Sequence, residues 1–224
     1  MYDYNNMHLI QLLLGGGGTF FDIGANIGSF TLTASEQRDA RVHAFEPHPA
    51  TFRRLKENVE ANGRTNVFLH NLALGDSEST VLLTDKAGSA INHIVSGASQ
   101  EPGTVVVQCR RIDTLCEALA VVPEYVKLDV EGFEYDVLRG FGQLLSSVKV
   151  LMVEMNGLSD QRSHGQREVH TLLTSAGLSG PWECYFDERR LVPLAKQGRE
   201  DVLYISPFFR NTLSALGFRF SDGH

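Results

Sequence analysis

The sequence has few cysteines, no long hydrophobic run and no run of basic residues. Its three cysteines form no CxxC pair and have no histidine at ligand spacing, so we expect reduced thiols in a cytoplasmic protein and no zinc site. The apolar stretch from Leu9 to Leu14 is too short to span a membrane and follows no basic segment, so we expect neither a transmembrane span nor a signal peptide. A net charge of −7 without basic runs disfavours a nucleic-acid or membrane-surface partner. What remains is a globular domain with enough apolar residues for one core.

The stretch from Thr19 to Phe30, TFFDIGANIGSF, reads as a buried strand, a glycine turn and the start of a helix. In an open α/β sheet such a turn lies at the carboxyl end of its strand, where ligands bind. The glycines have GxxxG spacing after an acid, and the GxGxxG fingerprint of NAD-binding folds is missing. This pattern weakens the interpretation of the chain as an NAD-dependent oxidoreductase.

The acid in this turn indicates the class of cofactor. A carboxylate at Asp22 would repel a pyrophosphate but attract an ammonium group, such as the amino-acid end of S-adenosylmethionine. We therefore expect this cofactor to contact four residues of the turn: Asp22, Gly24, Asn26 and Gly28. The alternative is a plain strand-to-helix turn in which Asp22 only caps the helix.

The next two predicted strands also end in polar residues. Arg41 to Phe45 is followed by Glu46, close to the offset of about 20 residues from Asp22 at which an acid binds ribose hydroxyls in nucleotide folds. The strand from Val67 to His70 is followed by three residues that this placement puts beside the adenine: Asn71, Leu72 and Ala73. Local roles stay open for both segments, a helix cap for the acid and turn hydrogen bonds for the asparagine.

Two further predicted strands end in acids. The segment from Tyr125 to Glu134, YVKLDVEGFE, places Asp129 at a strand end with Glu131 two residues on, and the strand from Val148 reaches Glu154. Because the carboxyl ends of parallel strands meet at one edge of a sheet, acids from four strands would share a rim and favour a cationic ligand. Helix capping accounts for one acid of the Asp129 and Glu131 pair more easily than for both.

Five motifs in this order, FDIGANIGSF, HAFEPHP, NLALGDSE, RIDTL and KLDVEGFE, resemble the FkbM family of S-adenosylmethionine-dependent O-methyltransferases. The likeness covers roughly Phe20 to Glu154. It implies an α/β class I methyltransferase fold, which is Rossmann-like and doubly wound, with a mostly parallel seven-stranded sheet and an antiparallel terminal hairpin. It also implies methylation of a hydroxyl on a sugar, polyketide or similar small molecule. The absence of an NPPY-like motif disfavours a base or amide nitrogen as acceptor.

We expect three parts along the chain: a helical leader over 1–18, the methyltransferase domain over 19–206, and a tail over 207–224. The tail is expected to pack on the domain or to form a dimer contact, so the protein would be a monomer or a homodimer. Two β-rich runs, Thr80 to Thr84 and Thr104 to Gln108, are expected to pair as an inserted β-hairpin. The polar loop between them carries His93 and suits a mobile cover over an acceptor pocket.

The mechanism that these residues indicate is direct displacement, in which an acceptor hydroxyl attacks the sulfonium methyl group. The candidate bases are Glu131, Glu154 and His93, with Asp129 orienting the acceptor or the donor, although His93 also reads as an ordinary solvated histidine. Two alternatives stay open. In one, Asp129, Glu131 and Glu154 hold Mg²⁺ that acidifies the hydroxyl; in the other, the chain is a noncatalytic cofactor-binding module. We favour transfer without a metal.

Overall fold

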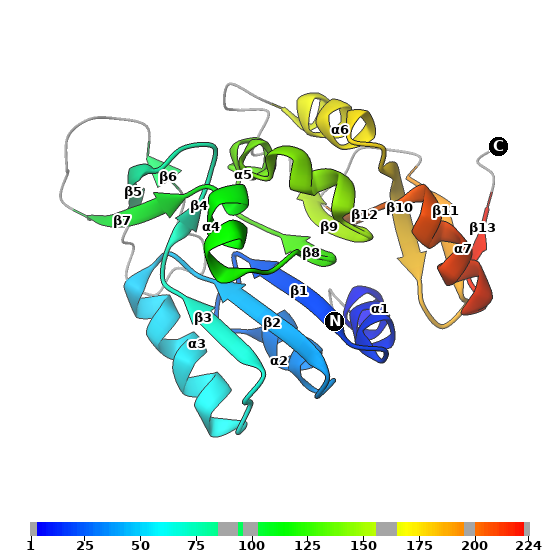
Figure 1. The fold of residues 1–224 in the computed structure, drawn as a ribbon, viewed down its shortest axis with the longest axis horizontal. Coiled ribbons are helices and arrows are strands. Elements are labelled where there is room, and N and C mark those ends of the chain that lie inside the picture. The colour runs from blue at the N-terminus through cyan, green and yellow to red at the C-terminus, as the bar shows by residue number, and fades with distance from the viewer. Residues whose placement is uncertain (1–3, 85–93, 96–102, 156–164, 195–199, 222–224) are drawn as a thin grey trace.

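The computed structural model describes residues 4–84, 94–95, 103–155, 165–194 and 200–221. Within these residues the centre is a nine-stranded sheet in the order β13-β11-β10-β12-β9-β8-β1-β2-β3, with helices on both faces (Figure 1). Its parallel part consists of β1 (Gly18–Ile23), β2 (Ala40–Phe45), β3 (Val67–His70), β8 (Tyr125–Leu128) and β9 (Val150–Met155). The antiparallel part adds β12 (Glu200–Ile205), β10 (Ser179–Tyr185) and β11 (Arg190–Pro193), and β13 (Arg219–Phe220) pairs with β11 in parallel.

The sheet has the predicted mostly parallel α/β arrangement, but the predicted count of seven strands is wrong, because nine strands are paired among the described residues. The segment after β12 forms α7 (Pro207–Ala215) and then returns as β13 to the edge of the sheet. A strand of two residues carries no alternating pattern, so periodicity in the sequence does not reveal it. At the other end of the chain, α1 (Tyr4–Leu14) buries Leu9, Ile10 and Leu14.

Strand β1 shows why both faces of the sheet are covered. Phe20 and Phe21 are adjacent and both fully buried, so their side chains point to opposite faces. Phe20 shares a core with α1, α2 (Ser29–Ser35) and α7. Phe21 shares a core with α4 (Ile112–Leu119), α5 (Glu134–Gly140) and α6 (Gln166–Ser175). A 3-10 helix, η1 (Gly142–Ser147), follows α5. This two-sided burial is typical of a parallel sheet.

A second sheet lies at one end of the molecule, at the left of Figure 1, away from α7 and β13. Its order is β4 (Ala73–Leu74), β7 (Thr104–Arg110), β5 (Ser79–Thr84) and β6 (Ile94–Val95). The two runs predicted to form an inserted hairpin do pair antiparallel, with Thr80 opposite Gln108. They belong to this four-stranded sheet rather than to an isolated hairpin, because β4 and β6 add to their outer edges.

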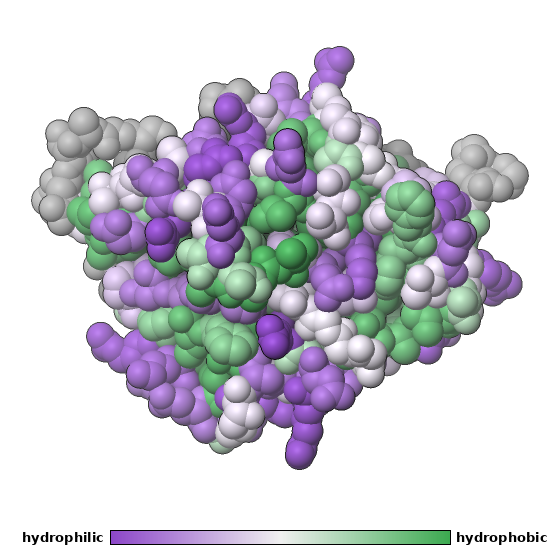
Figure 2. Space-filling model, viewed as in Figure 1, coloured by the Kyte–Doolittle hydropathy of each residue, from purple (hydrophilic) through white to green (hydrophobic). Residues whose placement is uncertain are grey.

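The surface follows from the amphipathic helices. Helix α3 (Pro49–Ala61) buries Leu55 and Val59 against the sheet and exposes charged residues such as Arg53 and Lys56. Figure 2 accordingly shows a largely hydrophilic surface over α3, at the lower left, with polar and apolar residues interspersed elsewhere on this face. None of the helices in the described ranges combines the length and the apolar composition needed to cross a bilayer.

Candidate active site

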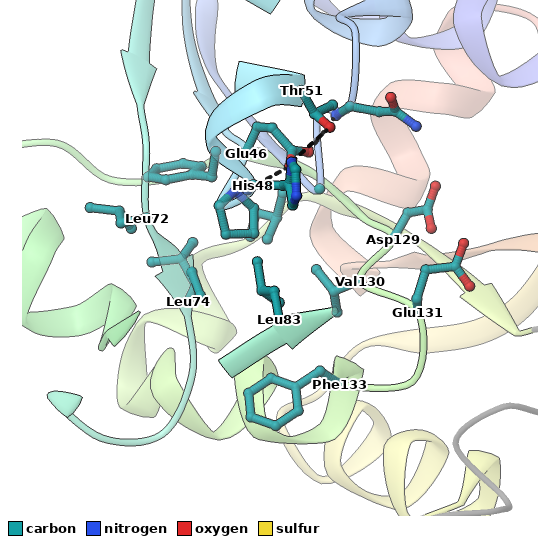
Figure 3. Close-up of a pocket in the computed structure, with 16 residues that line it drawn as sticks. Glu46, His48, Thr51, Leu72, Leu74, Leu83, Asp129, Val130, Glu131 and Phe133 are labelled. Atoms are coloured by element: carbon teal, nitrogen blue, oxygen red, sulfur yellow. Dashed lines mark hydrogen bonds between the residues drawn. The ribbon is translucent and has the colours of Figure 1, made fainter. Parts of the chain in front are cut away.

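A cleft opens at the carboxyl ends of β1, β2 and β8, which is where the sequence predicts a ligand (Figure 3). Its polar side carries Glu46, Asp129 and Glu131, and the last two extend their carboxylates toward the same side of the cleft. Its apolar wall consists of Leu72, Leu74, Leu83, Val130 and Phe133. Because Leu83 belongs to β5, the second sheet helps to close the cleft.

The turn after β1 is fixed by Gly24, which lines the cleft. Gly24 has a φ of 80°, and a Cβ atom at this position would lie 1.8 Å from the backbone oxygen of Asp129. Its N–H and that of Ala25 both donate to the carbonyl of Phe45, at 3.0 and 2.9 Å. The turn is therefore held against both neighbouring strand ends, and only glycine fits at this position.

Asp22 lies below the cleft rather than in its lining. Its side chain is fully buried, and the hydroxyl of Thr31 donates to Oδ2 at 2.5 Å. Oδ1 has no hydrogen-bond partner among the described residues. Burial raises the pKa of Asp22, although the nearby Lys127 ammonium and the Thr31 hydroxyl oppose that shift. Gly28, with a φ of 101°, also lies outside the lining, and a Cβ there would come within 2.7 Å of Leu55.

Glu46 is the acid that the end of β2 presents to the cleft. It is 7% exposed, and its two carboxylate oxygens accept the backbone N–H of Asn26 at 3.0 Å and of His48 at 2.9 Å. Asn26 adopts a φ of 51° and also lines the cleft. Burial raises the pKa of Glu46 to about 7, even though both N–H groups favour its ionised form. Each oxygen keeps a further lone pair for a ligand hydroxyl.

Of the three residues predicted to lie beside an adenine, two line the cleft and one does not. Leu72 and Ala73 line the cleft. Asn71 does not line it, because its Nδ2 donates to the carbonyls of Glu46 and Pro47, at 2.9 and 3.0 Å. Asn71 therefore ties the end of β3 to the loop that carries Glu46.

Asp129, Glu131 and Glu154 form an acidic cluster beside the cleft. One carboxylate oxygen from each lies within 4.8 Å of the others. Burial, followed by the charge of Asp129, raises the pKa of Glu154 to about 8, and a hydrogen bond with Asp129 adds to the shift. The charge of Asp201 contributes as well, since it lies opposite Glu154 on β12. Because Glu154 tends to stay protonated at neutral pH, the cluster carries less negative charge than three ionised carboxylates would.

The sequence pattern indicated no role for Lys127, which the structure places next to this cluster. Its Nζ donates to Oδ2 of Asp129 at 2.8 Å and lies 5.1 Å from the ring centroid of Phe30. Burial alone would lower the pKa of Lys127, but the carboxylates of Asp129 and Asp22 outweigh it and raise the pKa. A lysine inside an otherwise apolar strand was the available signal, because a buried ammonium needs a partner.

Glu134 was missed in the same way. Its side chain is 2% exposed, and Oε1 accepts the N–H of Gly132 at 2.9 Å. Burial raises its pKa. Its place directly after the acid-bearing turn was the only hint in the sequence. The remaining candidate, His93, lies outside the described residues, so its role as a base stays a prediction.

Two solved structures define the class of fold. The chain superposes on an rRNA methylase from Streptococcus thermophilus with a TM-score of 0.51 and 10% identity, over 89% of this chain and 91% of that one. It superposes on a Streptococcus mutans protein solved in complex with SAH with a TM-score of 0.50 and 11% identity, over 88% of this chain and 94% of that one. At such low identity the likeness establishes only the fold. It is the mostly parallel α/β fold of class I methyltransferases.

Sequence comparison then identifies the family. The family model described as the methyltransferase FkbM domain matches residues 22–179, so the chain belongs to the FkbM family. It is 34% identical over 160 residues to the hexuronic acid methyltransferase AglP of Haloferax volcanii, covering 71% of this chain and 62% of AglP. It is 32% identical over 164 residues to Methyltransferase 1 of Beauveria bassiana, covering 61% of this chain and 65% of that protein. The chain thus spans less than two thirds of the length of both relatives.

Proposed function

We propose that this chain is an S-adenosylmethionine-dependent O-methyltransferase that acts on a hydroxyl group of a small molecule, such as a sugar. The observation that carries the proposal is the cleft itself. Within an FkbM-family fold, one cleft combines the acid at the end of β2, the acids after β8 and an apolar wall. Carboxylates suit the cationic sulfonium and ammonium groups of this cofactor, and an apolar wall suits its adenine.

Each part of the proposed cofactor site uses a different chemical property of the cleft. Glu46 would accept hydrogen bonds from the ribose hydroxyls, because its carboxylate lines the cleft and is already oriented by two backbone N–H groups. Leu72 and Ala73 would flank the adenine ring. Asp129 and Glu131 would face the cationic end, while the buried Asp22 would act on it through its charge and through the shape of the turn.

The cofactor supplies an activated methyl group, so this chain's own residues need only position the acceptor and take its proton. Holding two reactants in contact can contribute as much as about 7–11 kcal/mol to lowering the barrier. Glu131 and Glu154 of the acidic cluster are the candidates to accept the hydroxyl proton. Lys127 would hold Asp129 in place through its hydrogen bond to Oδ2, so that Asp129 can orient the acceptor. A pKa of about 8 suits Glu154 to proton transfer near neutral pH.

The acceptor class rests on the relatives. AglP is named as a hexuronic acid methyltransferase, so sugar-type acceptors are the first compounds to test. Because the chain spans less than two thirds of that protein, the likeness does not extend to its complete substrate site.

Calorimetric titration with S-adenosylmethionine and S-adenosylhomocysteine tests the cofactor. We expect micromolar binding by the wild type and at least a tenfold loss, about 1.4 kcal/mol, for Glu46→Gln. Glu124→Gln is the matched control, because Glu124 also accepts a backbone N–H, that of Thr19 at 3.0 Å. It precedes β8 and so lies at the amino ends of the strands, away from the cleft. A folded wild type that binds neither compound would refute the cofactor assignment.

Turnover is then measured as release of S-adenosylhomocysteine with D-glucuronic acid, D-galacturonic acid and D-glucose as acceptors. Methylation of any of them that disappears in Glu131→Gln or Glu154→Gln supports the proposed chemistry. Normal cofactor affinity without turnover on any hydroxylated acceptor would instead favour a noncatalytic binding module.

A metal-assisted reaction is the second candidate, because Asp129, Glu131 and Glu154 each offer a carboxylate oxygen at mutual distances that suit one ion. A divalent ion there would bind and acidify the acceptor hydroxyl. Lys127 argues against it, since its ammonium lies 2.8 Å from Oδ2 of Asp129 and its positive charge would repel a divalent ion bound there. Turnover that persists in excess EDTA would remove this candidate, and restoration by Mg²⁺ after EDTA would establish it.

A further inference from the structure

The turn between β8 and α5 contains two consecutive residues in the left-handed region. Glu131 has a φ of 53° and Gly132 a φ of 92°. A left-handed glutamate is unfavourable by about 1 kcal/mol or more, so the surrounding structure must hold it there. The contacts within this turn identify the group that does so.

The first half of the turn is anchored by β1. The N–H of Asp129 donates to the carbonyl of Ile23 at 3.0 Å, and its own carbonyl lies against Gly24. These contacts fix Asp129 but do not reach Glu131.

The second half is anchored by Glu134, the first residue of α5. Its Oε1 accepts two backbone N–H groups of the turn, from Gly132 at 2.9 Å and from Val130 at 3.4 Å. These N–H groups flank Glu131 on both sides. The carboxyl group of Glu134 is almost fully buried, so water does not replace it as an acceptor.

The position of this turn decides the shape of one side of the cleft. Val130, Glu131 and Phe133 all line the cleft, Val130 and Phe133 on its apolar wall and Glu131 beside Asp129 (Figure 3). Glu134 holds the N–H groups of the residues before and after Glu131, so one glutamate controls the apolar and the acidic contacts together.

We propose that Glu134 is a positioning residue that holds Glu131 in its left-handed conformation and so sets the cofactor-facing side of the cleft. The proposal builds on the proposed function for the identity of the ligand. The role needs only one acceptor oxygen, because both N–H groups donate to the same atom. An amide can supply that oxygen, and therefore Glu134→Gln should replace the native residue while Glu134→Ala should not.

The test combines two readouts on the full chain. Titration with S-adenosylhomocysteine should show about a tenfold loss of affinity for Glu134→Ala and a value within about twofold of the wild type for Glu134→Gln. Amide hydrogen exchange without ligand should show faster exchange at Val130 and Gly132 in Glu134→Ala only. If Glu134→Ala fails to fold, Gly132→Ala perturbs the same turn, because a Cβ is disfavoured at its φ of 92°; it should also weaken binding about tenfold.

Glu168→Ala is the matched control, because Glu168 accepts the N–H of Gly165 at 3.0 Å at the start of α6 and does not line the cleft. It should lower the melting temperature without changing ligand affinity. Wild-type affinity and wild-type exchange in a folded Glu134→Ala would overturn the proposal. A wild type that does not bind S-adenosylhomocysteine would instead refute the proposed function, while the exchange rates would still test the role of Glu134.

Discussion

The turns after β1 and after β8 are built alike, yet they use their acids differently. Each follows a central parallel strand, contains a left-handed glycine and leads into a helix. The acid next to the first turn, Asp22, is fully buried and bonded to Thr31. The acid of the second, Asp129, has a side chain that is 32% exposed and lines the cleft. The carboxyl group next to the first turn is thus buried beneath the cleft, whereas that of the second turn faces the cleft.

The position of each acid relative to its strand explains this difference. Asp22 is still within β1, paired in register with Ala44 on one side and Lys127 on the other, so it lies inside the sheet. Asp129 is the first residue after β8 and lies beyond that pairing. Asp129, one residue past its strand end, is thus available to a ligand, whereas Asp22, within its strand, acts through its charge and its hydrogen bonds.

Replacing Gly24 by alanine should have the largest effect, because Gly24 packs the first turn directly against the second. A Cβ at 1.8 Å from the Asp129 oxygen cannot be accommodated without separating β1 from β8. We expect a loss of about 4 kcal/mol or more in the free energy of unfolding, or failure to fold, measured by urea denaturation.

Gly63→Ala is the control for this variant. Gly63 is also left-handed, with a φ of 61°, but nothing lies within 4 Å of its added Cβ. It should lose only about 1–2 kcal/mol, the cost of the left-handed conformation alone. Equal losses for the two variants would show that contact between the turns is unimportant.

Replacing Asp22 and Asp129 in turn by asparagine should separate the effect of each acid on stability from its effect on cofactor binding. Asp22→Asn should lower the free energy of unfolding by about 2–3 kcal/mol, because Lys127 loses a nearby charge in the buried interior. Asp129→Asn should have a smaller effect on stability, since its side chain is partly solvated, but should weaken S-adenosylmethionine binding more strongly. Urea denaturation and calorimetry of both variants test this, and the reverse order would contradict the assignment of roles.

The acidic cluster that the second turn forms with Glu154 of β9 should make binding depend on pH. The pKa of Glu154 is raised from 4.5 to about 8, so the folded protein retains a proton that the unfolded chain has already lost. The contribution of Glu154 to stability is therefore present below about pH 4.5 and is lost as the pH rises through 8. Ionised Glu154 should also favour the sulfonium cation by about fivefold, roughly 1 kcal/mol.

The measurement is the ratio of affinities for S-adenosylmethionine and S-adenosylhomocysteine between pH 6.5 and 8.5, since the two ligands differ in the charge on sulfur. The ratio should rise with pH in the wild type and stay flat in Glu154→Gln. A flat ratio in the wild type would mean that Glu154 lies too far from the sulfonium to affect it.

The sequence predicted the strand-turn-helix units and the acids at their ends because both depend on local pattern. Hydrophobic runs ending in glycine and aspartate locate β1 and β8 to within a residue or two. The pattern did not distinguish the burial of Asp22 from the exposure of Asp129, because burial depends on register between strands. Lys127 and Glu134 were missed for the same reason, since their partners are defined only once the chain has folded.

The end of β3 extends the comparison to a third strand and gives the smallest expected effect. Asn71 does not line the cleft but holds the loop of Glu46 through two carbonyl groups, so it should act on the cofactor indirectly. Asn71→Ala should weaken S-adenosylmethionine binding by only about twofold to threefold and stability by about 1 kcal/mol, because two exposed or half-buried hydrogen bonds are lost. A loss as large as that of Glu46→Gln would mean that Asn71 contacts the cofactor directly. The distinction between residues that line the cleft and residues that only support it would then not apply at the end of β3.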